Sequence, residues 1–225
     1  RDRRPLWSAD GTRLLFYSDR SGRYQVWTIA ADGSALMQVT DHPQSLIAPV
    51  WSPDGTRVVW AADRDGAQDL FVKSVDEAAR EQVLFRSDVP FKNPVDWSSD
   101  GHWIVMTHLD QDTSQNVWLL DASGSKPPTA IVRGGVRDNG GPVSPDGRWI
   151  AYTSEDTGRF EVYIQSFPAP GRKVQVSADG AVRAWWTRDG RQLVLLGGDF
   201  RTLSRVDLAP GTSPGVGTPG VGTPK

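Results

Sequence analysis

WSPDG, residues 51–55, is one copy of a five-residue phrase that recurs along the chain. The copies are WSADG (7–11), WSPDG (51–55), WSSDG (97–101), VSPDG (143–147) and WTRDG (186–190). Successive copies begin 44, 46, 46 and 43 residues apart. A regular spacing of this length indicates that each copy belongs to one repeated supersecondary unit.

The phrase itself has the composition of a tight turn. Pro53 presets φ for the first turn position, Asp54 suits the next, and Gly55 accepts a positive φ that would strain other residues. The phrase therefore predicts the end of one strand and its reversal into the next. We expect all five Asp-Gly pairs to be structural rather than catalytic.

Short apolar segments follow each phrase in the same order. The first are RLLFYS, RVVWAA, HWIVMT, RWIAYT and QLVLLG, and the second are QVWTIA, DLFVKS, NVWLLD, EVYIQS and SRVDLA. Four units add a third segment: LMQVT, EQVLF, TAIVR and KVQVS. Segments rich in β-branched and aromatic residues and bounded by Gly, Asp, Ser and Pro are typical of strands. Four strands in a period of 43 to 46 residues predict a β-propeller blade.

The predicted fold is therefore all-β, a propeller of about five four-stranded antiparallel blades or a fragment of a larger ring. The propeller occupies residues 1–209, with blades at about 5–46, 47–92, 93–139, 140–181 and 182–209. The innermost strands should end at Trp7, Trp51, Trp97, Val143 and Trp186, with the anchor tryptophans packed between neighbouring blades. Helix is limited to at most one turn at 76–80. Residues 210–225 form a Pro/Gly-rich tail that supplies at most an irregular outer strand through Gly215 to Val221.

The pattern W-S-P-D-G, apolar strand, S-x-x-x-G and aromatic-bearing strand resembles the TolB-type, WD-repeat-like propeller repeat over about residues 5 to 209. Within it, SPDGRWIAYTSEDTGRFEVYIQSFPAPGRKVQVS (144–177) is similar to the propeller regions of bacterial receptor-like serine/threonine kinases. Similar repeats occur in periplasmic TolB and in prolyl-oligopeptidase-like enzymes. The resemblance implies a periplasmic or extracytoplasmic location. Val143 departs from it by replacing the anchor tryptophan.

Composition and motifs give little support to catalysis or to nucleic-acid binding. The chain has no cysteine, a formal charge of −2 and no basic stripe. It has no G-x-S-x-G nucleophile elbow, and the G-x-G-x-x-G match at 215–220 lies in a proline-rich tail rather than between a strand and a helix. The loops at 63–69 and 110–112 place acidic residues at alternate positions, but neither completes a calcium-loop pattern. We expect no catalytic residue, no metal and no cofactor, and we expect the three histidines to lie on the surface or rim.

The loops that join one blade to the next are the predicted recognition elements, because loops on a rigid scaffold commonly carry binding residues. They are DHPQSLIAP (41–49), SDVPFKNP (87–94) and RGGVRDNGG (133–141). The candidate binding residues are His42, Phe91, Lys92, Arg133, Arg137, Asp138 and Asn139.

The sequence favours a non-catalytic module that binds a protein or peptide, as the sensor or docking domain of a larger bacterial protein. We expect a monomer that binds no nucleic acid and inserts no part of this segment into a membrane. Two alternatives stay open: a propeller-channel enzyme such as a lyase or lactonase-like hydrolase, and a purely structural or engineered repeat scaffold. We also predict a weak contact between the first and last blades, because the N-terminus supplies only its own inner strand.

Overall fold

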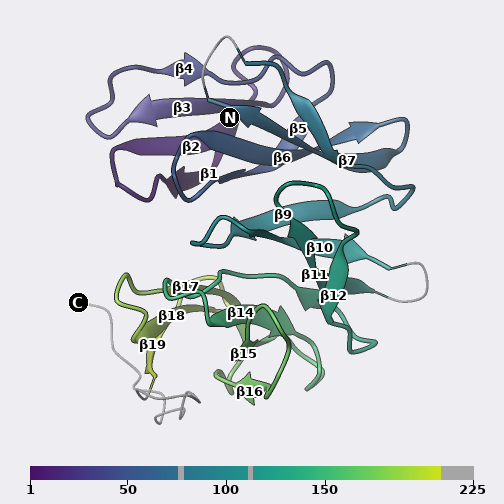
Figure 1. Ribbon diagram of the computed structural model, residues 1–225. Helices are drawn as coiled ribbons and strands as arrows, with labels where there is room; N and C mark the ends of the chain where they lie inside the picture. Colours follow the sequence, from purple (N-terminus) through teal and green to yellow (C-terminus); the bar gives the residue numbers. More distant parts are fainter. Residues whose placement is uncertain (76–78, 111–113, 209–225) are drawn as a thin grey trace. The chain divides into compact units, whose positions relative to one another are not determined.

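The computed structural model describes residues 1–75, 79–110 and 114–208, and these residues form strands and turns without a helix (Figure 1). No helix in this described part is long and apolar enough to cross a membrane. The helical turn expected at 76–80 falls largely on residues outside the described ranges, as does the outer strand expected at 215–221.

The chain divides into two compact units. Unit 1 comprises Arg1–Leu109 and Leu120–Pro128, and unit 2 comprises Asp110–Leu119 and the chain from Thr129 onward. Unit 1 holds two complete four-stranded antiparallel sheets. The first is β1 (Asp2–Trp7), β2 (Arg13–Ser18), β3 (Gln25–Ala30) and β4 (Met37–Gln38). The second is β5 (Leu46–Trp51), β6 (Arg57–Arg64), β7 (Ala67–Ser74) and β8 (Gln82–Phe85).

The third sheet has the strand order β12-β11-β10-β9. Its strands β9 (Lys92–Trp97) and β10 (Trp103–Leu109) belong to unit 1. Strand β12 (Thr129–Val132) lies in unit 2, and β11 (Gln115–Asp121) begins in unit 2 and ends in unit 1.

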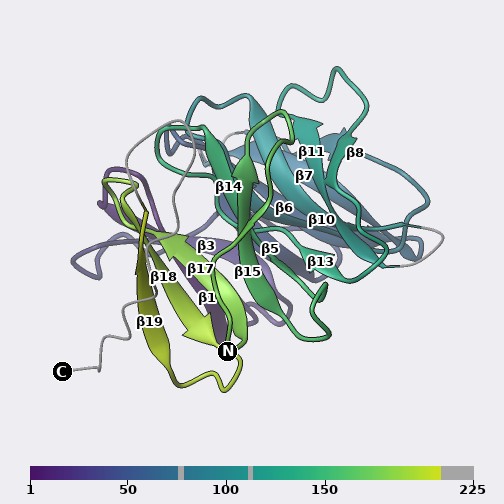
Figure 2. The ribbon, with the colours of Figure 1, turned by 90° about the horizontal axis from the view of Figure 1, so that it is seen from below.

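Unit 2 contains the last two sheets, and β17 of the fifth lies beside β14 and β15 of the fourth (Figures 1 and 2). The fourth sheet is β13 (Asp138–Asn139), β14 (Trp149–Ser154), β15 (Glu161–Ser166) and β16 (Val174–Gln175). The fifth is β17 (Ala181–Trp186), β18 (Gln192–Gly197) and β19 (Leu203–Asp207). The predicted all-β propeller class is confirmed, with three strands in the fifth sheet among the described residues.

The repeated phrase forms the turn that its composition predicts. In the second copy the Ser52 hydroxyl donates to Asp54 Oδ1 at 2.5 Å, and the Thr56 amide donates to the same oxygen at 3.0 Å. Gly55 has a φ of 66°, which a side chain would strain. The hydrogen bond from Ser52 leads the contacts that lower the pKa of Asp54 to about 2. The Asp-Gly pair is therefore structural, as expected.

The anchor tryptophans of the second and fifth sheets pack against the preceding sheet of their own unit. Trp51 Nε1 donates to the Leu6 carbonyl oxygen at 3.3 Å, while the Arg13 guanidinium lies 5.0 Å from the centroid of the Trp51 ring. In unit 2, Trp186 Nε1 donates to the Pro142 carbonyl oxygen at 2.9 Å. The predicted packing between blades is confirmed at these two positions.

Two details of the predicted inner strands were wrong. Trp7 is 58% exposed, whereas Trp51 is covered by the Leu6 carbonyl group and the Arg13 guanidinium. Strand β13 ends at Asn139, and Val143 makes an isolated bridge to Ile150. The other inner strands end at Trp7, Trp51, Trp97 and Trp186, as predicted.

Each unit has an apolar core built between its sheets. In unit 1, Leu15 and Val26 of the first sheet pack with Trp60 and Phe71 of the second. In unit 2, Val162 and Ile164 of the fourth sheet pack with Leu193 and Leu195 of the fifth. These cores hold the sheet ends, and therefore the loops between the sheets, in fixed positions.

Candidate binding loops

A buried polar residue stands at or near the start of the third strand in four sheets. These residues are Gln25, Asp69, Asn116 and Glu161. In an antiparallel sheet the third strand starts at the same end at which the outer strand finishes, so such a residue lies beside the loop that leads to the next sheet. A buried polar side chain needs hydrogen-bond partners. The loop supplies them directly to Gln25, Asp69 and Glu161. Asn116 instead donates to Asp110, whose carboxylate pairs with Arg133 of the loop.

In the first sheet this residue fixes the loop between β4 and β5. Gln25 Nε2 donates to the His42 carbonyl oxygen at 2.8 Å, and Gln25 Oε1 accepts from the His42 amide at 2.9 Å. The Thr40 hydroxyl donates to the same Oε1 at 2.8 Å. The backbone of this loop is thus held both as a hydrogen-bond donor, through the His42 amide, and as an acceptor, through the His42 carbonyl oxygen.

His42 is completely buried, so the expectation of a surface or rim histidine was wrong for this residue. Its Nδ1 lies 3.0 and 2.9 Å from the two oxygens of Glu81, and its ring centroid is 4.8 Å from that of Phe71. His108 is also buried, whereas His102 is exposed. Burial of His42 follows from the Gln25 contacts, which draw the loop onto the sheet.

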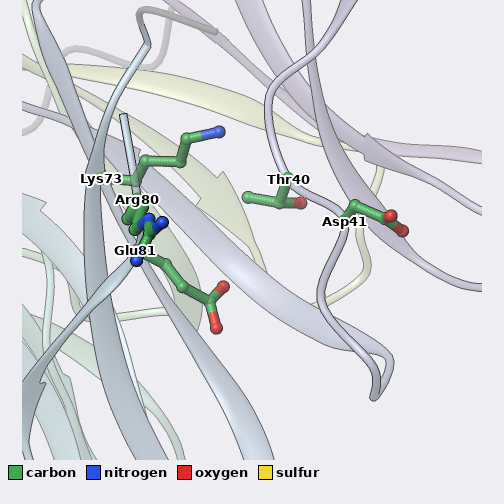
Figure 3. A pocket seen from close by; sticks show the side chains of 5 residues that line it. All are labelled: Thr40, Asp41, Lys73, Arg80 and Glu81. Carbon is green, nitrogen blue, oxygen red and sulfur yellow. The ribbon is translucent and has the colours of Figure 1, made fainter. Parts of the chain in front are cut away.

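A shallow pocket of about 360 Å³ lies beside this loop in unit 1. Figure 3 shows Lys73, Arg80 and Glu81 on one side of it and Thr40 and Asp41 on the other. Lys73 Nζ donates to the Val39 carbonyl oxygen at 2.6 Å. The lining therefore combines both charge signs, and its Glu81 carboxylate is already engaged by His42.

Phe91 is the last residue of the next loop of unit 1, and Lys92 is the first residue of β9. The Lys92 side chain is fully buried, and its Nζ donates to the Ser87 carbonyl oxygen at 2.8 Å, to Ser87 Oγ at 3.0 Å and to the Val89 carbonyl oxygen at 2.7 Å. Burial lowers the pKa of Lys92. The Phe91 carbonyl oxygen accepts from the Leu109 amide, and its side chain is half-buried. Lys92 thus closes the loop from inside and is not available to a ligand.

Ion pairs secure the outer parts of these loops. Arg86 Nε donates to Asp69 Oδ2 at 3.0 Å in unit 1. In unit 2, Arg133 Nε lies 3.0 Å from Asp110 Oδ2, which also accepts from Asn116 Nδ2 at 3.0 Å. Arg133 remains 62% exposed, so it can contact a partner without losing its ion pair.

Arg137 is the last residue of the loop between β12 and β13, and Asn139 ends the short strand β13. Arg137 makes a bidentate pair with Glu155, at 2.7 and 3.2 Å, and its guanidinium lies 5.1 Å from the Phe160 ring centroid. The hydrogen bonds that Arg137 donates to Glu155 raise the pKa of Arg137, so its guanidinium stays charged. Asn139 is half-buried, and its Nδ2 lies 3.5 Å from Thr153 Oγ1.

Asp138 differs from the other predicted binding residues. It is fully buried, and neither carboxylate oxygen has a hydrogen-bond partner among the described residues. The Ser154 hydroxyl and the Gly134 amide face the carboxylate without reaching hydrogen-bond geometry. Burial raises the pKa of Asp138 above its ordinary value. A buried carboxylate with a perturbed pKa and no partner marks a candidate binding site.

The fourth sheet carries the corresponding polar residue at Glu161. Its carboxylate accepts from the Ser177 hydroxyl, from the Gly180 amide at 3.0 Å and from Arg159 Nε at 2.7 Å. The loop between β16 and β17 is therefore pinned in the same way as the loop that contains His42.

Sequence reasoning missed this series of polar residues. Its signal is visible in the second apolar segments, which begin Q-V, D-L, N-V and E-V. A polar residue that recurs directly before four buried segments indicates an equivalent structural position in each blade rather than a chance surface position.

The loop at 63–69 forms a hairpin rather than a ligand cage. Asp63 Oδ1 accepts from the Gly66 amide at 2.9 Å, and Asp69 pairs with Arg86. Within the described residues, His, Cys, Asp and Glu form no group of three or more that could hold a metal ion. The loop at 110–112 falls mostly outside the described ranges.

The repeated four-stranded sheets and their pinned loops define a β-propeller. The family model for the TolB beta propeller domain matches residues 32–209. The chain therefore belongs to the TolB β-propeller family, and the resemblance inferred from the repeated phrase is confirmed.

Solved structures agree with this fold. A putative TolB from Agrobacterium tumefaciens is 18% identical with a TM-score of 0.76, over 92% of this chain and 77% of that one. TolB from Acinetobacter baumannii is 16% identical with a TM-score of 0.77, over 97% of this chain and 56% of that one. A puromycin hydrolase is 19% identical with a TM-score of 0.66, over 92% of this chain and 36% of that one. At these identities the likeness concerns the fold alone.

Proposed function

We propose that this chain is a non-catalytic binding module that presents its inter-blade loops to a protein or peptide. The observation that carries the proposal is the series Gln25, Asp69, Asn116 and Glu161, which ties the loops to the sheets from inside, in the case of Asn116 through Asp110 and Arg133. Loops held in this way lose little conformational entropy on binding, which favours recognition.

The exposed groups on these loops suit a polar partner. Arg133 and Arg137 stay largely exposed while their ion pairs hold them in place, and Phe160 backs the Arg137 guanidinium. Arginine presented in a fixed geometry favours carboxylates on a partner surface. Within this proposal the module is the sensor or docking part of a larger bacterial envelope protein, since the chain spans 77% and 56% of the two TolB chains that it matches.

The alternative is an enzyme in which the propeller accompanies a catalytic domain. The likeness to a puromycin hydrolase is the observation that favours it, because this chain spans 36% of that protein. In that case catalysis would belong to residues outside this sequence, and the propeller would still act through its loops.

Site-specific photo-crosslinking tests the proposal. A photoreactive residue is placed at Gln44 or Asp88, both exposed in inter-blade loops, and at Ser34 as the control, since Ser34 is exposed in the turn between β3 and β4. We expect the loop positions to crosslink a discrete protein partner in the native cell extract, and Ser34 to crosslink much less. The purified partner should then bind the Arg137→Glu variant at least tenfold more weakly. Equal crosslinking from Ser34, or an unchanged affinity of Arg137→Glu, would overturn the assignment to the loops.

A further inference from the structure

Five titratable side chains, the unpartnered carboxylate among them, form a cluster in unit 2. They are Asp138, Tyr152, Asp156, Tyr163 and Lys173, and each of the tyrosines is electrostatically coupled to both aspartates. Tyr152 and Tyr163 stack with ring centroids 5.9 Å apart. The Tyr152 hydroxyl is buried and, like the oxygens of Asp138, has no hydrogen-bond partner in the described part of the chain. Two buried polar groups are thus left unsatisfied in one place, which costs stability unless a ligand completes them.

Gly134 leaves room between the two carboxylates. A Cβ atom added at Gly134 would lie 3.5 Å from Asp138 Oδ2 and 3.7 Å from Asp156 Oδ1. The space beside this glycine is therefore bordered by oxygen atoms from both aspartates. Ionised carboxylates are acceptors only, so a group that fits here must donate hydrogen bonds or carry positive charge.

Lys173 shows which chemistry this cluster attracts. Its Nζ contacts Asp156 Oδ2 and lies 4.1 Å from the Tyr163 ring centroid and 5.9 Å from that of Tyr152. A cation over an aromatic face and beside a carboxylate is the arrangement that binds ammonium groups. Lys173 is a third exposed, so this ammonium is held at the surface and can be displaced.

We propose that Asp138, Asp156, Tyr152 and Tyr163, here called the ammonium cradle, bind a primary ammonium group of a partner, a lysine side chain, in competition with Lys173. The incoming ammonium replaces the Lys173 contacts with Asp156 and the tyrosine rings and donates to the Asp138 oxygens. This inference rests on the proposed binding function and names the chemistry of the group that the module recognises.

Other occupants fit the cradle less well. An anion would face two carboxylates at close range. A divalent metal ion prefers more oxygen ligands than two carboxylates supply, and it would lie beside the Lys173 ammonium. An ammonium group can donate hydrogen bonds to the carboxylate oxygens, lie over the tyrosine rings and balance the negative charge of the aspartates.

The test is an NMR titration of the full chain with N-acetyl-lysine-N′-methylamide as the probe. We expect the Lys173→Met variant to bind the probe at least fivefold more tightly than the unmodified chain, because the tethered competitor is gone. Adding Asp138→Asn to Lys173→Met should weaken binding at least fivefold, and Gly134→Ala should weaken it by occupying the space. The ε-acetylated probe, which carries no charge, should not bind. Butylammonium should bind like the probe, whereas a strong preference for the lysine derivative would assign recognition to the peptide group as well.

Three results would overturn the proposal: no binding of the probe to Lys173→Met, equal binding to the Asp138→Asn double variant, or displacement of the probe by equimolar calcium. The outcome is separable from that of the proposed function. Loop-specific crosslinking without probe binding would support the binding module and reject the ammonium cradle. Probe binding without loop-specific crosslinking would support the cradle and reject the assignment of partner binding to the loops. The Lys173→Met variant and its double variant with Asp138→Asn should keep the amide spectrum of the folded chain, since Lys173 is exposed and Asn has the shape of Asp.

Discussion

Lys92 and Asp138 occupy the same position in two different sheets. Each begins the inner strand of its sheet, and each pairs with the end of the second strand, Lys92 with His108 and Asp138 with Ser154. Both side chains are fully buried, but Lys92 donates three hydrogen bonds to its own loop while the Asp138 oxygens receive none within the described residues.

The difference separates a structural charge from a candidate binding charge. A buried ion with complete hydrogen bonding stabilises the surrounding loop, whereas a buried ion without partners destabilises the fold and is retained for another reason. One blade position therefore serves loop closure in one sheet and, by our proposal, recognition in another.

The largest effect expected from this comparison is that of Lys92→Met. Methionine fills the space of the aliphatic stem but leaves the carbonyl oxygens of Ser87 and Val89 buried without a donor. We expect the free energy of unfolding to fall by about 3 kcal/mol, measured by urea denaturation. A loss under about 1 kcal/mol would show that water replaces the ammonium and that Lys92 does not close the loop.

Asp138→Asn should act in the opposite direction. The amide keeps the shape of the side chain and removes a buried charge that has no partner, so we expect unfolding at pH 7 to cost about 1 kcal/mol more. The midpoint of the same urea transition measures it. Clear destabilisation would mean that the carboxylate is satisfied in solution and would remove the contrast with Lys92.

The pH dependence of the two variants should also have opposite signs. Burial raises the pKa of Asp138 above its ordinary 3.8, so above pH 3.8 the folded state keeps a proton that the unfolded state has lost, and stability falls as pH rises through this window. Burial lowers the pKa of Lys92 below its ordinary 10.5, so below pH 10.5 the unfolded state holds the extra proton, and stability rises as pH approaches 10.5.

These slopes are read as differences between the unmodified chain and each variant, because the turn aspartates titrate as well. The hydrogen bonds of Asp10 and Asp54 lower their pKa values to about 2, so their contribution is lost as pH falls. The difference curve for Asp138→Asn should change as pH rises above 3.8, and that for Lys92→Met as pH falls below 10.5. Flat difference curves would contradict the burial of either charge.

The sequence predicted the features that depend on local chemistry. The turn at Ser52–Gly55 and the strands around it follow from residues within one phrase, and each repeat confirms the others. The position of Trp51 between sheets was predictable because a repeat precedes it in the chain and supplies the neighbouring blade. The exposure of Trp7 was not predictable from the phrase, because Trp7 and Trp51 stand in the same local pattern.

The roles of individual loop residues could not be predicted, because distant partners decide them. His42 is buried by Gln25 and Glu81, which lie 17 and 39 residues away. In the sequence, Lys92 and Asp138 are both charged residues in or beside inter-blade loops. Only the structure shows that the carbonyl oxygens of Ser87 and Val89 accept hydrogen bonds from Lys92. Burial and pairing of this kind depend on tertiary neighbours that no local pattern specifies.

The smallest effect is expected at Arg137, next to Asp138 in the chain. Its bidentate pair with Glu155 has good geometry, but the Arg137 side chain is 53% exposed, and exposed ion pairs contribute about 0.2–1 kcal/mol. Arg137→Ala should therefore lower the free energy of unfolding by about 0.5 kcal/mol, and 0.5 M salt should remove most of that difference. A loss above about 2 kcal/mol would make Arg137 a structural residue like Lys92. A small loss for Arg137→Ala, together with weakened partner binding by Arg137→Glu, would instead group Arg137 with Asp138. Both residues would then contribute to binding rather than to the stability of the fold.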